Sequence, residues 1–255
     1  MRGAEADPPC GMSVWMDAVS HDHQNEKTIV ASWTGGKDGC LAAYRAMLEG
    51  YRISHLLAFR SMEKDGAHDI NPALLRAQAE AIGIPIVERD YRSYERAFLE
   101  VVDELRRTGV RIDGAVFGHI ATHGSLVERV CGTLGLDPVL PLWGRDPREL
   151  ITEIVEAGFE AVIIGVRDGV MGSRWLGRRI DASFLRELAE MEPGVDPCGE
   201  NGEFHTVVTD GPIFSRRIAI EAGEPIQRDG HWLLRVTSFS LVEKERFMSG
   251  SGKGG

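Results

Sequence analysis

Residues 28–47 read TIVASWTGGKDGCLAAYRAM and join a strand-like run, a turn with two glycines and a helical pattern. In a parallel α/β sheet, ligands gather at the carboxyl ends of the strands, where the next helix offers unpaired N–H groups and a positive dipole end. Gly35 and Gly36 allow close approach of the backbone because they carry no Cβ atom. Thr34 adds a hydroxyl and Lys37 a positive charge. The turn therefore predicts a phosphate-binding loop.

Asp38 follows Lys37 in this loop and has two candidate roles. Its carboxylate can cap the helix, or it can bind a Mg²⁺ ion that is also held by phosphates. The loop is not a Walker A motif, because GxxxxGK[ST] is absent. A tight turn with an exposed lysine has the same sequence pattern, and TGGKDG alone does not decide between the two.

Strand-like and helix-like segments alternate after the loop. Asn71 and Pro72 supply an N-cap and a first-turn proline for one helix, and Gly83 ends it. Gly50, Gly109 and Gly158 lie where helices should end. Possible capping boxes are Ser125 with Glu128 and Asp146 with Glu149. Strand-like runs lie at 28–33, 53–59, 84–88 and 114–120. This alternation predicts an α/β fold with a Rossmann-like parallel sheet covered on both faces.

The pattern changes near residue 140. AVIIGV at 161–166 continues the α/β alternation, but EFHTVVTD, RIAIEAG and HWLLRVTSFSLV follow with little helix between them. We therefore predict a nucleotide-binding domain over 27–140 and a C-terminal α+β domain over 141–245. The chain ends have the composition of a loosely ordered extension and a flexible tail, at 1–26 and 246–255.

Composition narrows the class of protein. The formal net charge of −10 argues against a broad nucleic-acid-binding surface. No apolar run has the length of a membrane span, and the N-terminus lacks the features of a secretory signal. The four cysteines show no CxxC spacing, which is typical of reduced thiols. We expect a cytoplasmic protein that does not associate with membranes.

Longer segments carry a resemblance. SWTGGKDGCL at 32–41 resembles the pyrophosphate loop of the adenine-nucleotide α-hydrolase superfamily, whose members cleave ATP between the α and β phosphates. The segments at 141–166, 175–181 and 198–214 are similar to the diphthine–ammonia ligase family. The resemblance implies an ATP-dependent amide ligase that uses ATP and Mg²⁺, adenylates a carboxylate with release of pyrophosphate, and transfers ammonia with release of AMP. In the namesake reaction the carboxylate belongs to diphthine on a translation elongation factor.

The resemblance also implies roles for the loop residues. Lys37 and Asp38 would act in catalysis, and Asp38 would bind the metal. Two departures from the family pattern concern Gly39 and Thr34, which stand where the pattern has serines, and a third is Gly118-His119 at the end of the fourth strand. The full set expected to bind ATP is Ser32, Thr34, Gly35, Gly36, Lys37, Asp38, Gly39 and Gly118.

CGENGEFHT at 198–206 is the most specific of the matching segments. Its glycines allow tight turns, so we expect Glu200, Glu203 and His205 to converge opposite the phosphate loop. His205 would take a proton from attacking ammonium, and Glu203 would orient its imidazole or hold the ammonium. The set expected to bind substrate is Glu200, Asn201, Glu203, His205 and Thr206.

Two other kinds of site are weighed against these. His119, His123 and Cys131 raise the hypothesis of a zinc site, but no fourth ligand is evident and packing is the simpler interpretation. Cys198 near His205 raises the hypothesis of a thiol nucleophile with a base, which requires spatial evidence that the sequence lacks.

Two other functions share the loop. One is a tRNA-modifying ATP pyrophosphatase, which the acidic composition and the missing CxxC pair disfavour. The other is a regulatory module that binds ATP without turnover, which Gly39 would allow. The sequence is also compatible with a homodimer, and it leaves the acceptor and the adenine-contacting residues open.

Overall fold

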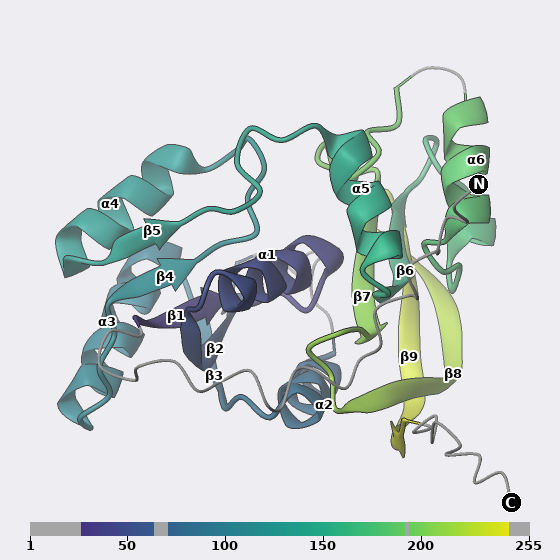
Figure 1. The fold of residues 1–255 in the computed structure, drawn as a ribbon. Coiled ribbons are helices and arrows are strands. Elements are labelled where there is room, and N and C mark those ends of the chain that lie inside the picture. Colours follow the sequence, from purple (N-terminus) through teal and green to yellow (C-terminus); the bar gives the residue numbers. More distant parts are fainter. Residues whose placement is uncertain (1–26, 64–70, 192–193, 245–255) are drawn as a thin grey trace, which may run out of the picture.

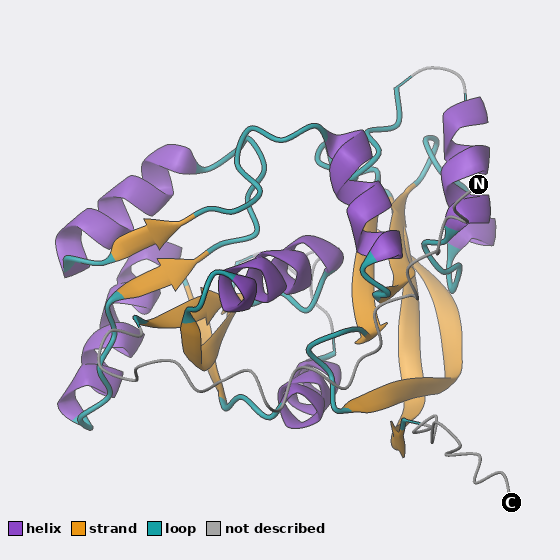
Figure 2. Cartoon of the chain, viewed as in Figure 1, coloured by secondary structure: helices purple, strands orange, loops and turns teal. Residues whose placement is uncertain are grey.

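The computed structural model describes residues 27–63, 71–191 and 194–244, and the expected extension and tail lie outside these ranges. Figure 1 shows two sheets side by side, each with helices packed on it, and Figure 2 separates helices from strands by colour. The first half of the chain contains β1 (Thr28–Ser32), α1 (Lys37–Leu48), β2 (Arg52–Ser61), α2 (Pro72–Ile82), β3 (Ile86–Tyr91), α3 (Tyr94–Arg107), β4 (Gly114–Val116), α4 (Gly124–Leu134) and β5 (Asp137–Val139). The second half contains α5 (Pro147–Glu156), β6 (Glu160–Arg167), the 3₁₀ turn η1 (Ser173–Trp175), α6 (Ala182–Glu190), β7 (Phe204–Asp210), β8 (Arg216–Arg228) and β9 (His231–Glu243).

The first sheet is parallel, as the sequence predicts. Its strand order is β3-β2-β1-β4-β5, so the chain runs outward from β1 in one direction and then returns to add β4 and β5 on the other side. The strand order therefore reverses between β1 and β4, which is where open α/β sheets bind ligands. The β1–α1 loop lies at this point.

Alternation along β1 builds a core on each face of this sheet. Ile29 and Ala31 belong to the cluster that contains α1 and α2, whereas Val30 packs with the residues of α3 and α4. A strand buried on both faces needs a continuous apolar run, and TIVAS provides one. The prediction of a Rossmann-like sheet covered on both faces is confirmed.

The second sheet has the order β7-β6-β9-β8 and is antiparallel, so the prediction of an α+β second part is also confirmed. AVIIGV, which appeared to continue the α/β alternation, instead forms the interior strand β6 of this second sheet. The predicted boundary at residue 140 lies between β5 and α5.

The structure differs from the sequence predictions at three places. The fourth strand ends at Val116 instead of 120, because the chain turns there toward the β1–α1 loop. α4 begins at Gly124 after a left-handed His123, so Ser125 is inside the helix and does not cap it. β5 was not predicted, because its three residues contain a proline and only Val139 is buried.

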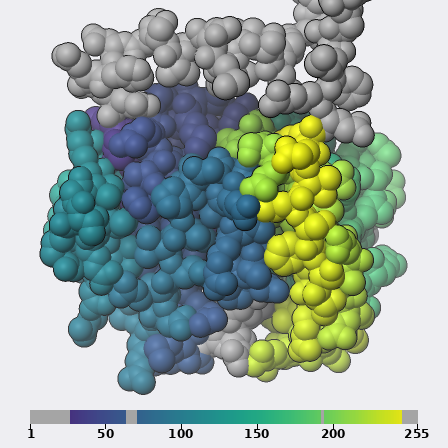
Figure 3. All heavy atoms as spheres, turned by 90° about the horizontal axis from the view of Figure 1, so that it is seen from below, coloured from purple at the N-terminus to yellow at the C-terminus, as the bar shows by residue number. Residues whose placement is uncertain are grey.

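The two halves of the chain pack closely. The Ser215 N–H donates to the Ala81 carbonyl at the end of α2 (2.7 Å), and Arg45 of α1 forms a bidentate pair with Glu153 of α5 (2.5 and 2.6 Å). Figure 3 shows the blue surface that includes α2 in direct contact with the yellow surface of β9. Within the described ranges, no helix combines the length and apolar character needed to cross a membrane.

Candidate functional site

The β1–α1 loop has the backbone shape that its glycines predict. Gly35 adopts a left-handed conformation (φ +74°), and Gly36 is the extended N-cap residue of α1. A Cβ atom on Gly35 would lie 2.5 Å from Gln78 Oε1, so residue 35 has neither the conformation nor the space for a side chain. The loop therefore brings bare backbone to the N-terminus of α1.

Gly118 lies directly against this loop. A Cβ atom at this position would be 2.7 Å from the Gly39 nitrogen and 2.8 Å from the Asp38 carbonyl carbon. The structure thus brings the segment after β4 to the first turn of α1. Residue 118 must be glycine for the two backbone segments to approach this closely.

The loop hydroxyls have different surroundings. Thr34 is exposed, and its Oγ1 lies 3.9 Å from the point where a Cβ of residue 39 would be. A hydroxyl is therefore present beside Gly39 although the serine of the family pattern is missing there. Ser32 Oγ is instead hydrogen-bonded to Tyr94 Oη of α3 (2.9 Å).

Lys37 is the first residue of α1 and is only 4% exposed. Its Nζ donates to Asp38 Oδ2 (2.7 Å) and to the Cys198 carbonyl oxygen, and it lies 5.3 Å from the centre of the Phe204 ring. Burial is the largest single influence and favours the neutral amine, but the attraction of its neighbours together, with Asp38 the strongest of them, outweighs burial and raises the pKa of Lys37. The side chain is therefore an ammonium at neutral pH, and it contacts the segment of the second half that most resembles the family.

Two carboxylates lie near this ammonium. Asp38 Oδ1 is buried and has no hydrogen-bond partner, although Oδ2 is paired with Lys37. Burial and the charge of Asp38 raise the pKa of Glu200. The cluster thus combines one cation with two carboxylates, and Asp38 Oδ1 is a buried carboxylate oxygen with no hydrogen-bond partner.

Glu203 is 1% exposed and organises its own loop. Its carboxylate accepts hydrogen bonds from the Asp196 N–H (3.2 Å), the Asn201 N–H (3.0 Å) and Asn201 Nδ2 (3.0 Å). Burial would raise the pKa of Glu203, but these hydrogen bonds outweigh burial and lower it. The carboxylate is committed to holding residues 196–203 in shape, which differs from the expected contact with an imidazole or ammonium.

His205 does not join the cluster, which corrects the expected convergence. Successive side chains of a strand point to opposite faces, and Phe204 and Thr206 of β7 face the loop. His205 therefore faces the other side of the sheet, where its ring lies 6.3 Å from that of His231 and against Gly165. The geometry does not support His205 as the proton acceptor beside Lys37.

Thr206 has a structural partner in place of a substrate. The Lys37 N–H donates to Thr206 Oγ1 (3.1 Å), so a hydroxyl from β7 caps a helix that has no side-chain cap of its own. Thr206 is 6% exposed, and the bond joins the two halves of the chain.

We expect Thr206→Val to lower the free energy of unfolding by about 1 kcal/mol, because the first N–H of α1 loses its acceptor. Thr206→Ser keeps the hydroxyl and should recover most of that loss. Urea unfolding of the three proteins measures this, and equal stability of the valine and serine variants would contradict the capping role.

The two competing kinds of site are not supported. His119 and His123 stack with ring centres 5.0 Å apart, and burial lowers the pKa of His119 to about 4. Among the residues with described placement, no group of three or more His, Cys, Asp or Glu side chains is arranged to hold a metal. Burial raises the pKa of Cys198 to about 12, so its thiol is a poor nucleophile.

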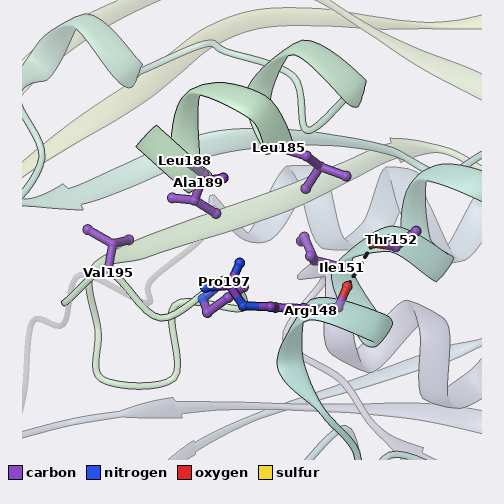
Figure 4. Close-up of a pocket in the computed structure, with 8 residues that line it drawn as sticks. All are labelled: Arg148, Ile151, Thr152, Leu185, Leu188, Ala189, Val195 and Pro197. Carbon is purple, nitrogen blue, oxygen red and sulfur yellow. Dashed lines mark hydrogen bonds between the residues drawn. The ribbon is translucent and has the colours of Figure 1, made fainter. Parts of the chain in front are cut away.

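A small pocket of about 100 Å³ lies between α5 and α6 and is also lined by Val195 and Pro197 (Figure 4). Its lining includes Arg148, Leu185 and Pro197 but no residue of the β1–α1 loop. Thr152 in its wall donates to the Arg148 carbonyl oxygen (2.7 Å), as the dashed line in Figure 4 shows. Lys37, Asp38 and Glu200 are not among the residues that line this pocket.

Comparison with known families agrees with the residue-level resemblance. Residues 27–138 match the model of the diphthamide synthase N-terminal domain, and residues 146–245 match that of the diphthamide synthase C-terminal domain. The chain belongs to the diphthamide synthase family. The site of this diphthamide synthase family member lies inside the matched regions. The N-terminal match contains the loop at 32–39, and the C-terminal match contains the segment at 196–206.

Individual relatives cover most of this family member. The chain is 28% identical over 225 residues to the diphthine–ammonia ligase of Danio rerio, covering 78% of this chain and 88% of that protein. It is 28% identical over 255 residues to the diphthine–ammonia ligase of Rattus norvegicus, with coverage of 85% and 93%. A solved structure described as a predicted subunit of tRNA methyltransferase from Methanocaldococcus jannaschii aligns with a TM-score of 0.40 and 15% identity, covering 73% of this chain and 98% of that one.

Proposed function

We propose that this diphthamide synthase family member is an ATP-dependent amide ligase that forms an acyl-adenylate and transfers ammonia to it. The main support for the proposal is the position of Lys37. Its ammonium is buried where the β1–α1 loop meets the Cys198–Glu200 segment. The names of the relatives agree with this chemistry. ATP and ammonia are therefore the proposed small substrates.

In the first step, a carboxylate oxygen of the acceptor attacks the α-phosphorus of ATP, and the bond to the β-phosphate oxygen breaks. Charge develops on the leaving pyrophosphate, and the N-terminus of α1 with the Lys37 ammonium is the positive region available to stabilise it. In the second step, ammonia attacks the acyl carbon, AMP leaves, and one proton is released. We propose Glu200 as the acceptor of that proton, because it lies near Lys37 and Asp38 and because burial and Asp38 raise its pKa, which makes it a stronger base.

Mg²⁺ is the proposed cofactor. Asp38 Oδ1, buried without a partner, fits a hard cation, which usually binds one or two carboxylates and the oxygens of the substrate phosphates. When bound, the ion would neutralise phosphate charge. Asp38 would hold it, and Glu200 is the second carboxylate close enough to interact electrostatically with Asp38.

The proposed acceptor is diphthine on a translation elongation factor, as the names of the relatives indicate for those proteins. The protein would then act in the cytoplasm, where translation takes place. Of the residues predicted to contact the acceptor, Glu200 is supported by its position beside Lys37 and Asp38. Glu203 and Asn201 would contribute by shaping the loop.

We expect AMP and pyrophosphate in equal amounts when the protein is given ATP, Mg²⁺, ammonium chloride and an elongation factor carrying diphthine. The loop is suited to a leaving pyrophosphate, and the same reaction should yield one amide per AMP. Chromatography of the nucleotides and mass spectrometry of the factor measure both products.

Omission of the diphthine-bearing factor is the control, and it should abolish AMP formation. ADP with orthophosphate would contradict the assignment to this chemistry. ATP binding with no product under any of these conditions would favour a regulatory module. Modification of tRNA in place of the elongation factor would favour the tRNA-modifying alternative.

A further inference from the structure

Gln78 is a buried polar residue on the apolar face of α2. The helix reads PALLRAQAEAI, and Gln78 is 0% exposed among buried leucine and alanine side chains. An amide in such surroundings is costly unless it is hydrogen-bonded. Gln78 satisfies this requirement with three bonds, two to the β1–α1 loop and one to β7.

The three partners of Gln78 lie in the β1–α1 loop and on β7. Its Oε1 accepts from Trp33 Nε1 (3.0 Å), and its Nε2 donates to the Gly35 carbonyl (2.9 Å) and to the Val208 carbonyl of β7 (2.7 Å). The Val208 N–H also donates to the Gly35 carbonyl (2.9 Å). One planar amide therefore joins two residues of the β1–α1 loop to β7 of the second sheet.

These bonds fix the direction of one peptide unit. In a trans peptide the C=O and the following N–H point in opposite directions. Because the Gly35 carbonyl is directed toward Gln78 and Val208, the Gly36 N–H points away from them. Gly35 is left-handed and could rotate readily without this restraint, since glycine has wide conformational freedom.

We propose that Gln78 is a positioning residue for the reaction: it holds the Gly35–Gly36 peptide so that the Gly36 N–H, together with the N-terminus of α1, faces the phosphates of ATP. This inference rests on the proposed function. Gln78 itself touches no substrate and acts through Gly35. The second sheet takes part directly, because Val208 supplies both a donor and an acceptor to the same junction.

Two substitutions test this role. Gln78→Met keeps the volume but removes all three bonds, and we expect kcat for pyrophosphate release to fall on the order of 10²-fold, as for loss of one oriented donor, with a smaller change in KM for ATP. Gln78→Glu keeps an acceptor for Trp33 but turns a carboxylate oxygen toward two carbonyls. Burial and these carbonyls should raise its pKa, and protonation restores one donor.

The ratio of activity of Gln78→Glu to that of Gln78→Met should therefore rise as the pH falls. A purely structural role would give a ratio that does not change with pH. Thr209→Val is the matched control, because Thr209 is also buried and lies on β7, and its hydroxyl bonds to the Glu160 carbonyl (3.1 Å) away from the loop. We expect the control to retain the parental kcat.

Wild-type kcat in a folded Gln78→Met protein, or a ratio independent of pH, would overturn the inference. If the parental protein releases no pyrophosphate, the proposed function fails, and hydrogen exchange then decides the positioning role separately. Faster exchange of residues 33–40 in Gln78→Met than in Thr209→Val would support it, and equal exchange would overturn it. Should Gln78→Met not fold, exchange in Gln78→Glu at high and low pH provides the same decision.

Discussion

Lys37→Ala is expected to lower the rate of pyrophosphate release on the order of 10²–10³-fold, with a much smaller change in ATP affinity. The ammonium is buried, and Asp38 with the other neighbouring groups raises its pKa in spite of burial, so it carries full charge at neutral pH. Negative charge develops on the leaving pyrophosphate in the transition state, and a fixed ammonium stabilises that state more than it stabilises bound ATP. Rapid-quench measurement of pyrophosphate and titration calorimetry with ATP separate the two effects.

Lys27→Ala provides the matched control. Lys27 precedes β1 and pairs with Asp137 (2.8 Å), but both side chains are more than half exposed and lie at the opposite end of the strand from the loop. Loss of such a surface pair typically costs less than about 1 kcal/mol and should leave catalysis intact. Unchanged pyrophosphate release in a folded Lys37→Ala protein would remove Lys37 from the mechanism.

The sequence predicts the parts of this fold that have strong local signals. The apolar run at β1, the two glycines and the following helical pattern define the β1–α1 unit, and Asn71 with Pro72 marks the start of α2 as observed. Asp146 caps α5 as predicted, through a bond from the Arg148 N–H (2.7 Å). In each case the decisive contact is within a few residues of the signal.

The elements that differ depend on contacts made far along the chain. β5 contains three residues, so its pairing with β4 determines it and its own composition does not. β6 has the apolar character of a parallel strand, and only its pairing with β7 and β9 assigns it to the second sheet. The contact of the Cys198 carbonyl with Lys37 involves a backbone atom, which no side-chain pattern reveals.

Two features of the site follow from sequence patterns alone. Strand alternation alone separates His205 from Thr206, since adjacent residues of β7 cannot face the same side. Gln78 is a polar residue on the buried stripe of α2 that includes Leu74 and Ala81, and such a residue requires partners. The identity of those partners, in the loop and on β7, requires the three-dimensional structure.

Gly118→Ala is expected to displace the β1–α1 loop and to lower turnover on the order of 10²-fold. Moving catalytic groups by about 1 Å typically has an effect of this size. The added Cβ would lie 2.7 Å from the Gly39 nitrogen and 2.9 Å from its Cα, and backbone atoms cannot move aside as a flexible side chain can. Overpacking of this kind typically costs about 1–3 kcal/mol, so the melting temperature should also fall. Initial rates of AMP formation and thermal unfolding measure the two effects.

Gly132→Ala separates this steric effect from a general effect of replacing glycine. Gly132 lies inside α4, and a Cβ there would meet no atom within 4 Å, so alanine should be neutral or stabilising by roughly 0.5–1 kcal/mol. Neither glycine has a left-handed backbone, so alanine causes no conformational strain at either position and the two variants differ in the available space. If Gly118→Ala retains parental turnover, the first turn of α1 can shift without loss, and the close contact between the β4 end and the loop is not needed for the reaction.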